Sequence, residues 1–312
     1  FLTNNFFEKR IVVVENSLTK QWLQLRMAED PDLTICMGME FLEGERVFEA
    51  LLGVFCPTPP KIFPGKWEMA LLLQEWGREQ GMSWGKSCGI AEYFTSYSRF
   101  GGIMPEHLQN LWNQMQDQYG WISCQEALLK AIQSSISPIE GSLHFFCPRL
   151  FTREEVRFLE YLAHTLPVWI YQFSPCELFW SDLCSDLERT HLLQYWEKKT
   201  GSSSPALLQL QQLLEDRHPL LANWGSLGRR MAKQWEGSFV ESMVYYPKLE
   251  RPNSLLQQVQ QDVLTMQLPV VRSPDSSLQL LRAAHPREEV EMVYQALLQL
   301  FQQQTDLEPK DC

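Results

Sequence analysis

The first 37 residues contain no glycine, and this absence excludes a standard phosphate loop near the N-terminus. Ile11–Val14 is a continuous β-branched run, typical of a strand covered on both faces in a parallel sheet. A phosphate loop between this strand and the amphipathic helix that follows needs GxxxxGKS or GxxxxGKT, because glycines let the backbone wrap around the phosphates. The turn instead reads ENSLTK, and its Lys20 is followed by Gln21.

Metal-ligand spacing is also absent. The six histidines form no HxxxH or HExxH pattern, and no two cysteines form a CxxC pair. We therefore expect no metal in this chain and buried, reduced thiols at the eight cysteines, which are Cys36, Cys56, Cys88, Cys124, Cys147, Cys176, Cys184 and Cys312.

No apolar run approaches the length of a membrane span, and no signal peptide is visible. The sequence begins with FLTNN, without Met, and stops at EPKDC directly after a long helical pattern. We interpret it as a piece of a larger cytoplasmic protein that does not enter a membrane.

Positive charge is scarce, since the net charge is −11. This balance argues against a protein that coats nucleic acid through a general basic field, and leaves a narrow basic track or a basic partner chain. The best basic cluster is Arg229, Arg230 and Lys233, for which a solvated helix face is the alternative. The 11 Trp and 17 Phe fill cores in most proteins, or they supply stacking surfaces for bases.

Strand and helix patterns alternate on both sides of a long helical stretch. Helical patterns fill most of 44–132 and recur around 178–187 and 191–200, and GSSSP (201–205) is the clearest flexible punctuation. We predict an α/β fold with a parallel sheet and a helical insertion at about 43–138. The expected strands lie at 11–14, 33–37, 142–148, 168–175 and in SLQLLRAAH, which a short turn and a long helix follow.

Three short patterns imitate catalytic motifs, and none meets its requirements. GMSWGKS (81–87) has one residue too few between its glycines and follows a helical pattern instead of a strand. Glu308–Lys310 offers half of a metal-dependent nuclease site, but a proline interrupts the motif and the end of the sequence is near. GSLG (225–228) lacks the GxSxG spacing of a nucleophile elbow. The sequence therefore predicts no active site in this chain.

Two groups of residues are candidates for binding. Asn16, Ser17 and Gln21 stand at or near a helix N-terminus, where they can hydrogen-bond phosphates or base edges, or where Asn16 or Ser17 simply caps the helix. The strip from Glu92 and Tyr93 to Arg99 interleaves aromatic and charged residues, a pattern suited to stacking single-stranded bases. Core packing is the alternative for the second group.

Several segments resemble one family. PLLANWGSLGRR (219–230) resembles the PLL-x-W-G-x-L-G-R signature of RecC, the gamma subunit of exodeoxyribonuclease V. Residues 12–28, 144–182 and 278–311 also resemble RecC segments, in the family's order. The residues that carry the signature are Trp224, Gly225, Gly228 and Arg229.

The resemblance implies the fold of a superfamily 1 helicase that has lost its ATP-binding motifs, which agrees with a glycine-free turn. Residues 1–42 and 139–273 then correspond to the 1A domain, 43–138 to a helical 1B-like insertion, and 274–312 to the start of a truncated 2A-like domain. No cofactor is expected in this chain.

The resemblance also implies a function. RecB-like and RecD-like partners supply the ATP- and Mg²⁺-dependent motors and the nuclease, while RecC holds them, splits the forked double-stranded DNA and guides a single strand through a channel for hotspot inspection. The chain is then a non-catalytic subunit part of a complex that repairs double-strand breaks by recombination. The alternative is a purely protein-binding scaffold, and an active enzyme is a distant third.

Particular residues take roles from the resemblance. Ser17 and Gln21 occupy positions at which the family contacts hotspot bases, and Phe48 matches a tryptophan in a channel-facing helix. Glu92 and Tyr93 match an acidic–apolar pair. These residues, with Asn16 and Arg99, are the predicted nucleic-acid contacts.

The sequence departs from the family at three of these places. Glu15 replaces the family's Gln at the turn, Thr95 replaces an Asp, and Gly101 displaces the Arg of a YRP segment, with Arg99 two residues earlier. General passage of a single strand is still expected, whereas recognition of the same hotspot sequence does not follow.

Overall fold

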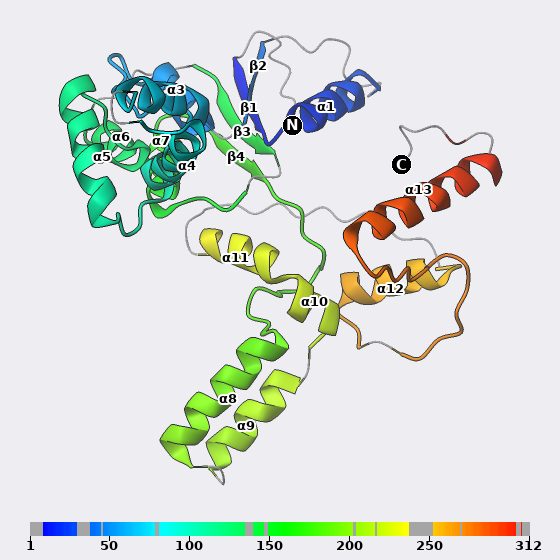
Figure 1. Cartoon of the computed structure of the whole chain (residues 1–312). Helices are drawn as coiled ribbons and strands as arrows, with labels where there is room; N and C mark the ends of the chain where they lie inside the picture. The colour runs from blue at the N-terminus through cyan, green and yellow to red at the C-terminus, as the bar shows by residue number, and fades with distance from the viewer. Residues whose placement is uncertain are drawn as a thin grey trace. The chain divides into compact units, whose positions relative to one another are not determined.

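The computed structural model describes residues 9–29, 38–44, 46–78, 81–134, 140–146, 149–201, 204–215, 217–236, 252–268, 270–303 and 307. The chain forms two compact units (Figure 1). Unit 1 comprises Phe1–Ser174 and Gly225–Met243, and unit 2 comprises Pro175–Trp224 and Val244–Cys312. Among the described residues, no helix is both long and apolar enough to cross a membrane.

A four-stranded parallel sheet organises unit 1. Its order is β2-β1-β3-β4, and its strands are β1 (Arg10–Val14), β2 (Met39–Glu43), β3 (Ser142–Phe146) and β4 (Val168–Tyr171). The predicted strands around β1, β3 and β4 are confirmed. The strand predicted at 33–37 lies outside the described residues, and β2 begins just after it. All five residues of β1 are buried, as expected for a strand with a neighbour on each side.

Helices cover both faces of this sheet, because successive side chains of a strand point to opposite faces. Ile11 and Val13 pack in the larger core with α2, α6 and α7, whereas Val12 and Val14 pack with Leu23 of α1. Figure 1 shows α1 and the group α6–α7 on opposite sides of the strands. The bounds are α1 Ser17–Glu29, α2 Val47–Phe55, α6 Cys124–Gln133 and α7 Arg153–Ala163.

The stretch between β2 and β3 is helical, as predicted, but only its middle forms a separate core. Its ends, α2 and α6, pack on the sheet. Between them, the Trp112 ring stacks on Phe63 at a centroid distance of 3.7 Å and meets Phe94 edge-on at 5.2 Å. The helices of this insertion core are α3 (Lys66–Trp76), α4 (Trp84–Phe100) and α5 (Glu106–Tyr119).

Unit 2 is helical over its described residues. Cys176, Trp180 and Leu221 form its small core. Its helices are α8 (Asp186–Thr200), α9 (Pro205–Glu215), α10 (Pro219–Trp224), α12 (Leu255–Thr265) and α13 (Pro286–Gln303), while α11 (Ser226–Trp235) lies in unit 1.

Two expected elements of unit 2 were wrong. The helix expected over 191–200 is confirmed as part of α8, but the one expected over 178–187 is wrong. Residues 178–185 are irregular, Trp180 enters the core from them, and α8 begins only at Asp186, where Ser185 and Glu188 form a capping box. SLQLLRAAH forms no strand, and its Leu280 is 96% exposed. A strand needs a neighbour to pair with, and the described part of unit 2 contains no other strand.

We expect the insertion core to depend on Trp112. Trp112→Ala removes a buried ring and leaves a cavity, so the free energy of unfolding should fall by about 4 kcal/mol in urea titrations followed by circular dichroism. The matched control is Trp67→Ala on α3, where the ring is exposed and the loss should stay below about 0.5 kcal/mol. Equal losses in the two variants would show that Trp112 is not packed as described.

Candidate nucleic-acid interface

The β1–α1 turn lies at the carboxyl edge of the sheet, at the position where strand order reverses. β1 pairs with β2 on one side and β3 on the other, so the chain leaves β1 in both directions. In open α/β sheets, ligands bind outside the carboxyl ends of the strands at this switch point. Glu15 and Asn16 form the turn, and α1 starts at Ser17.

Asn16 caps α1. Its Oδ1 accepts hydrogen bonds from the Thr19 backbone N–H at 2.9 Å and from the Thr19 hydroxyl at 3.1 Å. One of the free N–H groups that a bound phosphate would use at a helix N-terminus is therefore occupied by the chain's own side chain. The local cap is what the structure shows, and a contact of Asn16 with DNA stays a prediction.

The outer surface of α1 carries polar and apolar groups together. Ser17 and Gln21 are both exposed, as the predicted contacts require. Beside them Trp22 is 50% exposed, with its ring centroid 5.9 Å from that of Phe146 and the Arg26 guanidinium 5.8 Å from the ring. A hydroxyl, an amide and an indole are the groups that hydrogen-bond and stack unpaired bases.

Trp22 is not among the contacts predicted from the sequence. The structure shows that Leu23 is the one buried residue of α1. Consecutive positions are separated by 100° on a helix, so Trp22 and Leu23 do not both face the sheet. The sequence shows this spacing, but it does not show which of the two residues is buried against the sheet.

Phe48 lies in the core. It is buried, stacks at 6.1 Å on Phe145 and meets Phe151 edge-on at 5.6 Å. The predicted base contact at Phe48 therefore has no exposed ring face in this structure, because the amphipathic helix α2 turns this position towards the sheet.

Glu92 and Tyr93 lie on α4 and contact other protein groups. The Lys66 ammonium donates a 2.8 Å hydrogen bond to Glu92, and this bond lowers the pKa of the Glu92 carboxyl. The Tyr93 hydroxyl donates to the Ile103 carbonyl at 2.6 Å. Figure 1 shows α1 and α4 on opposite sides of the sheet, so the predicted contacts do not form one surface within unit 1.

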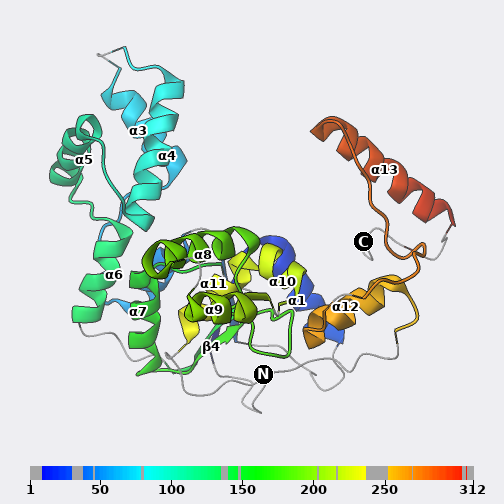
Figure 2. The ribbon, with the colours of Figure 1, turned by 90° about the horizontal axis from the view of Figure 1, so that it is seen from below.

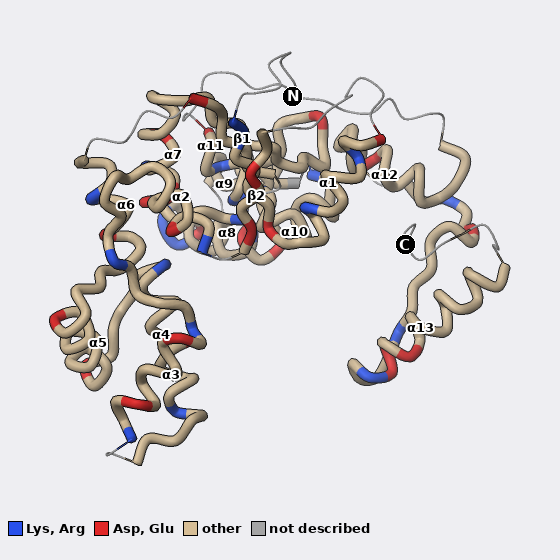
Figure 3. The backbone as a smooth tube through the Cα atoms, turned by 90° about the horizontal axis from the view of Figure 1, so that it is seen from above, with Lys and Arg blue, Asp and Glu red and all other residues tan. Residues whose placement is uncertain are grey.

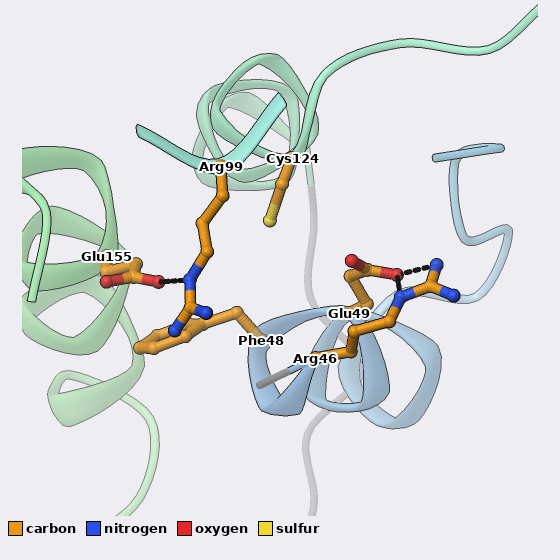
Figure 4. A pocket seen from close by; sticks show the side chains of 6 residues that line it. All are labelled: Arg46, Phe48, Glu49, Arg99, Cys124 and Glu155. Carbon is orange, nitrogen blue, oxygen red and sulfur yellow. Dashed lines mark hydrogen bonds and ion pairs between the residues drawn. The ribbon is translucent and has the colours of Figure 1, made fainter. Parts of the chain in front are cut away.

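Arg99 points inward, towards α7 (Figure 4). Its side chain is only 14% exposed, and its Nε lies 3.8 Å from Oε1 of the buried Glu155. Glu155 also accepts a 3.0 Å bond from Arg149 and a 2.8 Å bond from the Thr152 N–H. Arg99 is thus part of a buried charge cluster that joins the insertion to the sheet layer, instead of a surface contact for phosphate.

The hollow beside Arg99 is too small for a nucleotide. It is lined by Arg46, Phe48, Glu49, Arg99, Cys124 and Glu155 (Figure 4), and its volume of about 10 Å³ admits at most one water molecule. Burial raises the pKa of the Cys124 thiol to about 12, so the thiol stays protonated and is no nucleophile.

On the face of the sheet opposite this hollow, a buried network of hydrogen-bonded side chains resembles a catalytic pair. The His144 Nε2 lies 2.8 Å from the Ser142 hydroxyl, and its Nδ1 lies 3.1 Å from the Tyr171 hydroxyl. Ser142 and His144 are buried, and burial lowers the pKa of His144 to about 4. A nucleophile and its base must be open to substrate. We therefore interpret these residues as a satisfied polar network within the fold.

The signature segment spans the junction of the two units. Trp224 ends α10 in unit 2 with its ring exposed, and Gly225 and Gly228 begin α11 in unit 1. Arg229 is buried while Arg230 and Lys233 are exposed, so the basic cluster expected from the sequence is divided between the interior and the surface. Figure 3 shows both basic and acidic positions on the insertion helices α3 and α4, whereas α5 carries acidic positions alone.

No metal centre is found among the residues that the structure describes. The described cysteines are Cys56, Cys88, Cys124, Cys176 and Cys184, and none of these is in a disulfide. GMSWGKS forms the start of α4, where the Ser83 side chain caps the helix by accepting from the Lys86 N–H.

The comparison with known families decides the affiliation. The family model for RecC, N-terminal domain, matches residues 103–266, more than half of the chain. The chain belongs to the RecC family. RecBCD enzyme subunit RecC of Haemophilus influenzae is 29% identical over 178 residues, which cover 49% of this chain and 16% of that relative.

Asn16→Ala tests the cap. The variant leaves the Thr19 backbone N–H without its side-chain partner, so the free energy of unfolding should fall by about 1 kcal/mol in urea titrations. Asn16→Asp keeps a capping oxygen and should retain the wild-type value. If both variants unfold like the wild type, Asn16 does not cap α1.

Glu155 gives a prediction about pH. Burial is the largest influence on this carboxyl and raises its pKa above 4.5, although Arg149 and Thr152 act in the opposite direction. The folded protein therefore binds the Glu155 proton more tightly than the unfolded chain, and ionisation of this group reduces stability as pH rises from 4.5 through the folded pKa.

Glu155→Gln removes this titration. The free energy of unfolding of the variant minus that of the wild type should therefore increase as pH rises from 4.5 to neutrality, measured by urea titration at each pH. Glu160→Gln, also on α7, serves as the control. A pH-independent difference for Glu155→Gln would contradict the raised pKa.

Proposed function

We propose that this chain is the helicase-like N-terminal part of a non-catalytic subunit of an exodeoxyribonuclease V complex, and that it guides single-stranded DNA during double-strand-break repair. The observation that carries the proposal is the β1–α1 turn. It occupies the ligand position of an α/β sheet, its helix start is capped by Asn16, and Ser17, Gln21 and Trp22 are exposed beside it.

The fold supports a helicase ancestry without helicase chemistry. A parallel sheet in the order β2-β1-β3-β4, with a helical insertion between β2 and β3, is the arrangement expected of a 1A-like domain with a 1B-like insertion. The turn has side chains where phosphate-binding loops need glycine. We therefore assign ATP and Mg²⁺ to RecB-like and RecD-like partner subunits of a cytoplasmic complex.

The negative net charge of the chain limits how much it can contribute to the binding of DNA by the complex. At a net charge of −11, the chain attracts a polyanion only locally, so other subunits would supply most phosphate contacts with single-stranded and forked DNA. The residues of α1 would contact bases instead. Because Glu15, Thr95 and Gly101 depart from the family pattern, we propose strand passage without assigning a hotspot sequence.

The second candidate is a protein-binding scaffold that holds the motor and nuclease subunits and does not recognise DNA. Exposed apolar side chains favour it. On α1 these are Leu18 and Leu25, and on α13 they include Val290 and Val293. Such groups mark surfaces for partner proteins when they gather on one helix face.

Binding of single-stranded DNA separates the two candidates. We expect a fluorescein-labelled single strand to show increased anisotropy with the 312-residue chain at low salt, and the affinity to fall as salt rises. Gln21→Ala should weaken binding about fivefold, because one hydrogen bond of about 1 kcal/mol is lost.

Gln114→Ala on α5, an equally exposed glutamine of the insertion, is the matched control and should bind like the wild type. Identical affinity of the Gln21→Ala and Gln114→Ala variants would remove α1 from the strand path. Absence of any binding by a folded chain would favour the scaffold.

A further inference from the structure

The α8–α9 hairpin of unit 2 exposes aromatic side chains at one end, and packing within the hairpin does not explain them. α8 has no buried residue over 15 positions, and the two helices lie side by side in both views (Figures 1 and 2). In α9, Leu207 is buried, whereas Leu208 and Leu213 are exposed. The hairpin therefore presents most of its side chains to the outside within unit 2.

Aromatic and basic side chains gather at the end of α8. Tyr195 is 52% and Trp196 is 41% exposed, and their rings are 6.0 Å apart at 85°. The Lys199 ammonium lies 4.6 Å from the centroid of the Tyr195 ring. Lys198 is exposed next to it. Two ring faces and two positive charges thus lie within five consecutive residues.

Helix stability accounts for the lysines and leaves the rings unexplained. Lysines in the last turn favour a helix, because they complement the negative C-terminal end of the helix dipole. Tyr and Trp are weaker helix formers than Leu or Gln, and at these exposures they add little to a core. Exposed aromatic residues beside positive charge are typical of surfaces that stack bases and neutralise phosphates.

We propose that the Tyr195–Lys199 end of α8 binds single-stranded nucleic acid. Unpaired bases stack on Tyr195 and Trp196, and Lys198 and Lys199 pair with neighbouring phosphates. Charge complementarity selects this occupant, because two adjacent lysines stand out in a chain of net charge −11. The site lies in unit 2 and goes beyond the proposed function, which concerns α1 of unit 1.

Photocrosslinking of the 312-residue chain locates the contact. A single-stranded oligonucleotide that carries 5-iodouracil is irradiated with the protein, and the crosslinked tryptic peptides are identified by mass spectrometry. We expect crosslinks in the peptide 190–198, which contains Tyr195 and Trp196, and the α1 site yields a different peptide, 21–26. Crosslinks in 21–26 alone would overturn the hairpin site and leave the proposed function standing.

Anisotropy titrations then measure the contribution of each side chain. Tyr195→Ala should weaken binding about tenfold, whereas Tyr195→Phe keeps the ring and should bind like the wild type. Tyr294→Ala on α13 is the matched control, since that ring is 58% exposed. Affinity falls as salt rises, and Lys198→Gln should make the plot of log affinity against log salt less steep by about 0.7. Lys86→Gln, at an exposed lysine outside the site, should leave the steepness unchanged.

Wild-type affinity and salt slope in the Tyr195→Ala, Trp196→Ala and Lys198→Gln variants would overturn the proposal. It would also be overturned if these variants abolished assembly with a protein subunit and left single-strand binding unchanged, because the hairpin would then be a protein-docking surface.

Discussion

The burial of β1 between two parallel neighbours is the constraint on which unit 1 depends. Each of its five residues is buried, so both faces of the sheet must be covered and both edges of the strand must be paired. Parallel pairing requires long crossover connections, and these connections supply α1, the insertion and α7. The turn that follows β1 is thereby fixed at the carboxyl edge, next to the ends of β2 and β3.

The packing of α1 on the sheet around β1 also determines which of its side chains are buried and which are exposed. Its start is capped by Asn16, and its inner side contributes Leu23 to the sheet. Its outer side retains Ser17, Gln21 and Trp22 for contacts with other molecules. A helix start that holds phosphate in nucleotide-binding proteins is here capped by a side chain, and the base contacts proposed above rest on the exposed hydroxyl, amide and indole groups of this outer side.

The charge cluster around Glu155 has a structural role that the sequence pattern conceals. Arg99 comes from α4 of the insertion, whereas Arg149 and Glu155 come from the α7 region of the sheet layer. A buried carboxylate needs compensating positive charge, and removal of one partner leaves an uncompensated charge. Arg99 is therefore committed inside the protein, although its neighbours in the sequence suggested a strip for stacking bases.

The sequence alone determined the α/β class, the strands β1, β3 and β4, the helical insertion and the exclusion of a phosphate loop, because these follow from local patterns of apolar residues and glycine. It also identified the RecC family through PLLANWGSLGRR. Tertiary structure decided which side of each helix faces the core. It turned Phe48 and Arg99 inward, left Trp22 half exposed and denied SLQLLRAAH a partner strand, because burial and strand pairing depend on residues far away in the chain.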